Sequence, residues 1–313
     1  MNSSLVHIRF GSWCALLLLF MPLPMTAAKA QTEHAARRIS VAILDFGEMP
    51  TGKRMADDLW RALSSDAALA LMDRLEVRSA ARGASYKGSL NMSVGEARDL
   101  GAAISCDFFM TGDAQTLRRS PSNDQIFYEA YAAIFIVSAR TGRLLLWDRP
   151  SFTSATAQEA ERLLIMELKA RAAKYAEELR RAHNTEEEVR RRAAEAAVSA
   201  NAPREIEDIS AEENAVQANF RPPQPFRRLH PVYTVEAARA EAEATVDALV
   251  EIDAAGEVRD VEIVRWAGFG LDEATVNTIR QLHFRPAMRD GHPIPVRFLL
   301  RYNFRRPPKN ENR

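Results

Sequence analysis

The chain has 313 residues, which is enough for more than one domain. Its 42 lysine and arginine residues balance 42 aspartate and glutamate residues, which excludes a dedicated nucleic-acid-binding protein with its strong basic excess. With 47% hydrophobic residues, the chain can build cores and is not wholly disordered. The two cysteines, Cys14 and Cys106, exclude a framework of several disulfides, and they match no zinc-binding pattern.

Residues 1–30 have the three-part layout of a secretory signal peptide. A basic start without acids precedes an apolar run over residues 13–25, and an A-x-A cleavage site ends at Ala30, so we expect cleavage after Ala30. A membrane-spanning helix needs about 20 apolar residues, whereas this run is shorter and is interrupted by Pro22 and Pro24. The alternative is a leader that stays uncleaved as a membrane anchor.

Residues 38–150 predict an amino-terminal α/β domain. Apolar runs bounded by glycine or proline indicate buried strands, and Ser93 with Glu96 forms a capping box that begins a helix. The resulting order β-α-β-α-β-β-β is typical of an α/β or α+β sandwich. The predicted strands cover residues 39–46, 71–77, 107–112, 126–139 and 144–147, and the predicted helices cover about 55–63 and 93–103.

Three motifs of this domain occur in the order "VAILDF", "LG…CDFFMTGDAQ" and "TGRLLLWD". In this order they resemble the periplasmic α/β domains of the TolB amino-terminal and CsgG-like group. The resemblance covers about 110 residues and implies an exported interaction domain rather than an enzyme.

Residues 151–225 predict a charged helical spacer and a linker. Apolar residues form one helical stripe up to about residue 182, and the sequence beyond it is polar all round, which is typical of a solvated helix. The sustained heptads of a coiled coil are missing. Residues 220–226 contain three prolines and predict a stiff, extended lead-in to the next domain.

Residues 226–306 predict a ββαβ domain with one helix on a three-stranded antiparallel sheet. Residues 245–253 alternate between apolar and acidic, a turn follows at residues 254–256, and residues 257–265 return as the second strand. A helix is expected over residues 271–282. The last strand points Val296, Phe298, Leu300, Tyr302 and Phe304 inward, and Arg297, Arg301, Asn303 and Arg305 outward.

The sequence of this last domain resembles the TonB carboxy-terminal domain. The elements "DAAGEV", "GLDEA", "FRPA", "DGHPIPV" and the closing aromatic strand occur in family order across about 60 residues. The approach to the first strand departs from the family, because His230, Pro231, Val232 and Tyr233 replace the usual Tyr-Pro approach and an alanine- and glutamate-rich stretch follows. The overall fold class that we expect is therefore α+β, with an α/β sandwich, a helical spacer and a TonB-like domain.

The resemblance implies that an extended peptide adds to an edge of the small sheet, where backbone groups lack partners. Carried over to this chain, the pairing edge is the last strand. Arg297 and Arg301 favour an acidic peptide in this interpretation, whereas the alternative is a solvated face without specific contacts. Tyr302 also fits the core. The expected partner-binding residues are Val296, Arg297, Phe298, Leu299, Leu300, Arg301 and Tyr302.

These features predict a periplasmic adaptor that binds extended segments of an outer-membrane transporter or another envelope protein and supports transmembrane transport. One alternative is an anchored energy transducer, which keeps its leader and couples to an inner-membrane proton-driven complex. Another is an envelope assembly factor that acts through its amino-terminal domain. No nucleic-acid partner is expected.

We expect no catalytic, cofactor or metal residues, and hence no enzyme. Residues 47–53 nearly fit a phosphate-binding loop, but Arg54 stands where Ser or Thr should hold magnesium and Pro50 removes an amide, so a strand-to-helix turn is favoured. The histidines lack metal-ligand spacing. Asp45 is interpreted as a polar strand-end residue and Cys106 as a small buried hydrophobe.

Overall fold

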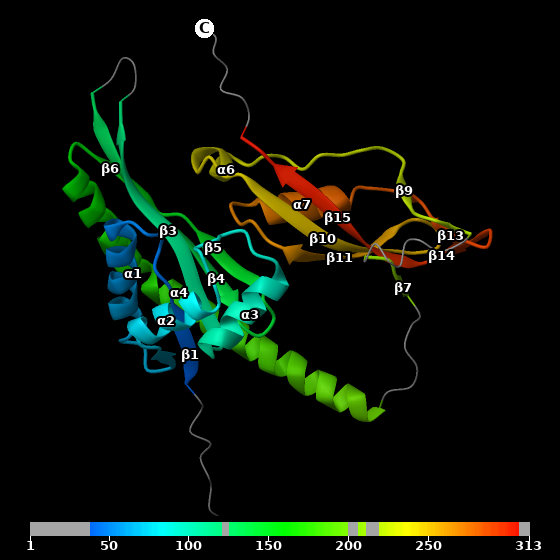
Figure 1. The fold of residues 1–313 in the computed structure, drawn as a ribbon, viewed down its shortest axis with the longest axis horizontal. Coiled ribbons are helices and arrows are strands. Elements are labelled where there is room, and N and C mark those ends of the chain that lie inside the picture. Colours follow the sequence, from blue (N-terminus) through cyan, green and yellow to red (C-terminus); the bar gives the residue numbers. More distant parts are fainter. Residues whose placement is uncertain (1–37, 121–124, 200–205, 211–218, 307–313) are drawn as a thin grey trace, which may run out of the picture. The chain divides into compact units, whose positions relative to one another are not determined.

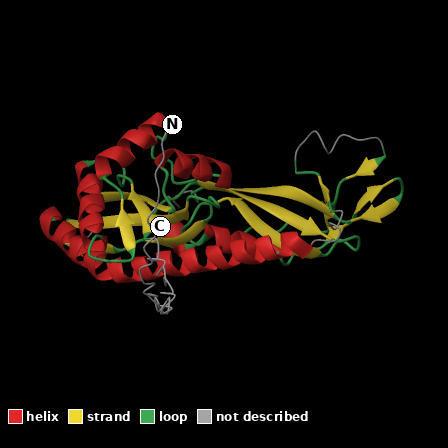
Figure 2. Ribbon diagram, turned by 90° about the horizontal axis from the view of Figure 1, so that it is seen from below, coloured by secondary structure: helices red, strands yellow, loops and turns green. Residues whose placement is uncertain are grey.

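The computed structural model describes residues 38–120, 125–199, 206–210 and 219–306, so the predicted signal peptide lies outside the described residues. From Arg38 onward the chain forms one compact unit. Its helices and strands are mixed, which confirms the predicted α+β class (Figures 1 and 2). No helix in the described ranges combines the length and the apolar character that a membrane crossing requires.

The amino-terminal part is built on a mixed sheet with the strand order β2-β1-β3-β4-β5 (Figure 1). β1 (Ile39–Ile43) runs parallel to both its neighbours, β2 (Leu69–Leu71) and β3 (Phe108–Arg119). β3 is antiparallel to β4 (Phe127–Ser138). The far edge of β4 pairs with β5 (Leu144–Asp148) and, at its other end, with β6 (Ser151–Ser154).

Helices cover both faces of this sheet because its strands are apolar on both sides (Figure 2). One face packs against α1 (Pro50–Leu63) and the first half of α4 (Ala157–Ser199). The other face packs against α2 (Arg74–Gly83) and α3 (Val94–Ile104). Successive residues of β1 point to opposite faces of the sheet. Ile39, Val41 and Ile43 pack against α1 and α4, and Ala42 packs against α2 and α3.

The long helix α4 has two halves with different environments. Leu164, Leu168, Tyr175 and Leu179 are buried in the core of the sheet domain, which confirms most of the predicted apolar stripe. Met166, also predicted for the stripe, is 55% exposed. Beyond Ala182 the described side chains are mostly exposed and carry arginine–glutamate pairs one turn apart. Such pairs stabilise an exposed helix only modestly, so the second half is a solvated extension of a helix that the core anchors.

The predicted strand over residues 71–77 is wrong for most of its length. β2 ends at Leu71 and α2 begins at Arg74. Asp73 causes the change, because its carboxylate accepts hydrogen bonds from the amides of Leu75 (2.8 Å) and Glu76 (3.1 Å) and caps the helix. The capping box at Ser93 and Glu96 is confirmed at the start of α3.

The carboxy-terminal part contains the predicted ββαβ elements. β10 (Ala244–Ile252) pairs antiparallel with β11 (Val258–Arg265) and with β15 (Val296–Phe304), and α7 (Leu271–Ile279) packs against the sheet. The predicted sheet has three strands, whereas the described sheet has a fourth, β7 (Glu207–Asp208). The remaining elements are α6 (Val235–Arg239), β8 (Phe220–Arg221), β9 (Gln224–Pro225), β12 (Phe284–Arg285), β13 (Ala287–Arg289) and β14 (His292–Ile294).

The two parts share one hydrophobic core instead of being joined only by a spacer. Trp266, which is 1% exposed, stacks on Phe135 of β4 with ring centroids 5.8 Å apart, and its indole N–H donates to the carbonyl of Gly142 (3.0 Å). The side-chain amide of Asn91 donates to the carbonyl of Thr245 in β10 (2.8 Å) and to the carbonyl of Trp266 (2.6 Å), the residue after β11. These contacts fix the small sheet against the large one.

Candidate peptide-binding edge

The last strand, β15, alternates as the sequence predicts. Val296 and Phe298 are buried in the core that contains Ile279 of α7, and Phe304 is buried in the core around Trp266. Arg297 and Arg301 lie on the opposite face. Leu300 and Tyr302 are half-buried on the inward side. The side chains of β15 therefore alternate between the core and the surface, so only its backbone runs along the whole proposed edge.

Hydrogen bonding reveals which backbone groups of β15 face away from β10. The N–H of Ile209 donates to the carbonyl of Arg297 (2.8 Å), so residue 297 directs its backbone groups to the outer edge. The direction alternates along a strand, and the backbone groups of Leu299, Arg301 and Asn303 therefore face the same edge. Within the described residues, no strand pairs with this edge beyond Arg297.

The outward arginines form ion pairs with the acids of the neighbouring strand. The guanidinium of Arg301 makes two hydrogen bonds to the carboxylate of Asp247 (2.6 and 2.9 Å), and this partner raises the pKa of Arg301. Arg297 pairs with Glu251 (3.0 Å), its direct cross-strand neighbour. These pairs stabilise the sheet. The side chain of Arg301 remains 57% exposed and open to further contacts.

A groove of about 610 Å³ follows the second half of β15. Consecutive residues 300–305 line it, and since alternate side chains point to opposite faces, such a lining belongs to the edge of the strand. The opposite wall is residues 225–233, the segment between β9 and α6 that passes β15 in Figure 1. Leu229 and Tyr233 add apolar surface, and Arg227 adds charge.

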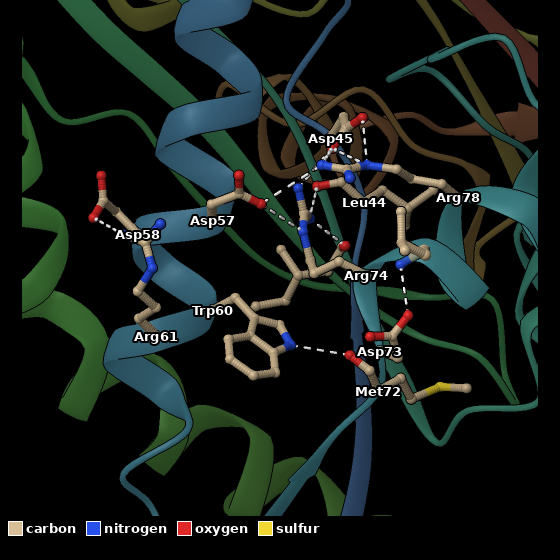
Figure 3. Close-up of polar contacts among 12 residues, drawn as sticks. Leu44, Asp45, Asp57, Asp58, Trp60, Arg61, Met72, Asp73, Arg74 and Arg78 are labelled. Carbon is tan, nitrogen blue, oxygen red and sulfur yellow. Dashed lines mark hydrogen bonds and ion pairs between the residues drawn. The ribbon is translucent and has the colours of Figure 1, made fainter.

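A second candidate site, the carboxyl end of β1, is filled by its own ion pairs (Figure 3). The carboxylate of Asp45 binds Arg74 (2.6 Å) and Arg78 (2.9 Å), as a polar strand-end residue does. In the loop that resembles a phosphate-binding motif, a Cβ on Gly52 would lie 1.8 Å from the carbonyl oxygen of Phe46. The backbone of Phe46 thus fills the space beside this glycine, and the loop serves as the predicted strand-to-helix turn.

The remaining candidates for a reactive or metal-binding site are the Cys106 thiol and clusters of metal-ligating side chains. Cys106 is half-buried, less than the predicted small buried hydrophobe, and burial raises the pKa of its thiol to about 12, so the reactive thiolate is suppressed. No group of three or more His, Cys, Asp and Glu side chains in the described ranges is arranged to hold a metal ion.

Two features of the edge escaped the sequence analysis. β7 comes from a segment interpreted as loose linker, because two paired residues leave no periodic signal. The groove needs residues 225–233 to lie along β15, which depends on long-range pairing between β9 and β12. The basic run of Arg227, Arg228 and His230 was the available signal for a charged wall.

Residues 229–305 match the family model of the carboxy-terminal domain of Gram-negative bacterial TonB protein. This match confirms the predicted resemblance and makes this part of the chain a TonB-like domain, a type that is periplasmic in Gram-negative bacteria. The resemblance of residues 38–150 to TolB amino-terminal and CsgG-like domains stays a prediction.

Solved structures give low-identity similarities that each cover less than half of this chain. The TonB carboxy-terminal domain of Pseudomonas aeruginosa is 18% identical over 35% of this chain and 99% of that chain, with a TM-score of 0.25. The hypothetical protein CT253 of Chlamydia trachomatis is 13% identical over 43% and 95%, with a TM-score of 0.31. The LpoB carboxy-terminal domain of Salmonella enterica is 10% identical over 39% and 87%, with a TM-score of 0.28. A comparison with curated proteins finds no match.

Proposed function

We propose that this TonB-like envelope protein is a periplasmic adaptor that binds extended peptide segments by β-strand addition at β15. The partners are outer-membrane transporters or other envelope proteins, and binding supports transport across the membrane. The observation that carries the proposal is the outer edge of β15, whose backbone groups from Leu299 onward have no strand partner within the described residues.

The shared core around Trp266 supports an adaptor rather than a transducer with independent domains. It holds the edge strand on a large, rigid sheet domain, and a preorganised edge loses less conformational entropy when a peptide binds. The proposed partner-binding residues remain Val296, Arg297, Phe298, Leu299, Leu300, Arg301 and Tyr302. Their shared contribution is the backbone of one strand, with Leu300 and Tyr302 forming part of the groove wall.

Replacing Leu299 by proline should weaken peptide binding by about tenfold or more. Proline removes an outward-facing N–H and places its ring where the peptide backbone would lie. The substitution leaves the pairing with β10 intact because residue 299 directs its backbone away from that strand, and an edge position tolerates proline. The measurement is capture of envelope proteins from extract by the purified full-length protein, followed by titration with a peptide from the captured partner.

Leu299→Ala is the matched control, because the side chain is 37% exposed and its loss leaves the backbone donor in place. We expect this variant to bind like the unchanged protein. Equal binding by the proline variant, with its fold verified by circular dichroism, would rule out strand addition at this edge.

The proposed localisation is the periplasm, after cleavage following Ala30. Mass spectrometry of the mature protein should therefore find an amino terminus at Gln31. A protein that still begins near Met1 and fractionates with the inner membrane would instead favour the anchored transducer and its proton-driven partner complex.

A further inference from the structure

A short segment of this chain already lies on the proposed peptide-binding edge. Residues 207 and 208 form β7, which runs parallel to β15 and pairs Glu207 with Val296 and Asp208 with Arg297. The segment ends in Ile209, whose side chain is 8% exposed and packs into the core beneath the sheet. The edge of β15 thus accepts an extended segment in one direction and holds an apolar side chain from it.

The segment is acidic, and the surface that it covers is basic. Glu207 forms an ion pair with Arg289 of β13. Hydrogen bonds from the side chain and the backbone N–H of Ser210 lower the pKa of the Asp208 carboxyl, and the nearby charge of Arg297 lowers it further. An acidic segment with an apolar anchor therefore sits where two arginines approach the edge.

The part of the edge that β7 leaves open is also lined by basic side chains. The groove along residues 300–305 is lined by Arg227, Arg228, His230, Arg301 and Arg305, and no acid is among its lining residues. Arg227, Arg228 and Arg305 are exposed, and within the described ranges none of them forms an ion pair with an acid of this chain. Their positive charge is available to a ligand.

We infer that the edge of β15 selects an acidic extended peptide, which runs parallel to β15, and that residues 206–210 occupy the first part of this edge as an internal competitor. The inference rests on the proposed strand addition and specifies its ligand. Acidic side chains of the peptide meet the arginines of the groove wall, alternating with apolar side chains against Leu300 and Tyr302. A peptide that covers the whole edge displaces β7.

The first test is a titration of the full-length protein with three synthetic peptides about as long as β15, in which valine alternates with glutamate, with serine or with lysine. We expect the glutamate peptide to bind tightest and the lysine peptide weakest, with about tenfold between the extremes. Equal binding of all three would overturn the charge selection while leaving strand addition intact. Absence of binding by every peptide would contradict both proposals.

A double variant, Arg227→Glu with Arg228→Glu, assigns the selectivity to the groove. It should weaken binding of the glutamate peptide by about tenfold and leave the serine peptide within about twofold. The matched control reverses the exposed Arg98 and Arg118, which lie on α3 and β3 and change the net charge equally. An equal loss in both double variants would trace the effect to net charge and overturn the assignment.

A second double variant, Glu207→Ala with Asp208→Ala, tests the internal competitor. Removing the two acids weakens β7 on the edge, so the glutamate peptide should bind several-fold tighter, on the order of the effect of one or two partly exposed ion pairs. Glu48→Ala with Asp99→Ala, which removes two exposed acids away from this edge, serves as the control with the same change in net charge. Unchanged or weaker peptide binding by the acid-free variant would show that β7 does not compete for the edge.

Discussion

Replacing Trp266 by alanine should lower the free energy of unfolding by about 3 to 5 kcal/mol, the range for deleting a large aromatic side chain from a packed core. Trp266 is almost completely buried, stacks on Phe135 and donates to the carbonyl of Gly142. Its loss leaves a cavity in the core that the two sheets share, and the carbonyl of Gly142 loses its donor. Urea denaturation of the full-length protein measures the change.

Trp266→Phe is the control, because it keeps most of the ring and removes the N–H. It should cost about 1 to 3 kcal/mol, the cost of leaving a buried acceptor without its donor. Tryptophan fluorescence would be altered by either change, so far-ultraviolet circular dichroism follows the transition. A loss below about 1 kcal/mol for the alanine variant would contradict a core shared by the two parts of the chain.

Arg74→Leu should destabilise the amino-terminal domain by about 3 kcal/mol, because it breaks a buried ion-pair network by removing one partner. The guanidinium of Arg74 donates to the carbonyls of Ile43 (2.5 Å) and Leu44 (3.1 Å) and to the carboxylates of Asp45 and Asp57 (Figure 3). Its side chain is 10% exposed. Burial lowers the pKa of Arg74 and the two acids oppose this effect. Chemical denaturation measures the loss.

Arg78→Leu removes the neighbouring arginine and serves as the comparison. Its side chain is 30% exposed, and Asp45 keeps its contact with Arg74, so we expect a cost of about 1 kcal/mol. A larger loss for Arg78→Leu than for Arg74→Leu would contradict a network organised around the more buried Arg74.

Local signals in the sequence predicted much of the carboxy-terminal domain. Apolar Val296 and Phe298 flank polar Arg297, which is the period of a half-buried strand. The turn residues around Gly256 and Asp290 mark where strands end. Each of these signals lies within a few residues of the element that it predicts. The ββαβ order could therefore be predicted without any long-range contact.

The contacts that build the candidate site are long-range, and the sequence alone does not predict them. Asn91 bonds to Thr245 and Trp266, which are more than a hundred residues away along the chain. β7 pairs with β15 through only two residues. Asp73 could have been recognised as a helix cap, but the apolar residues around it also fit a strand. Tertiary packing decides such cases.

Amide hydrogen exchange of β15, with and without a bound partner peptide, tests strand addition most directly. In the free protein, the amides of Phe298, Leu300 and Tyr302 face β10 and should exchange slowly, while those of Leu299, Arg301 and Asn303 face the open edge. We predict that a peptide from the captured envelope partner slows exchange at these three outward amides. Slower exchange elsewhere, with the three outward amides unchanged, would contradict the proposed binding edge.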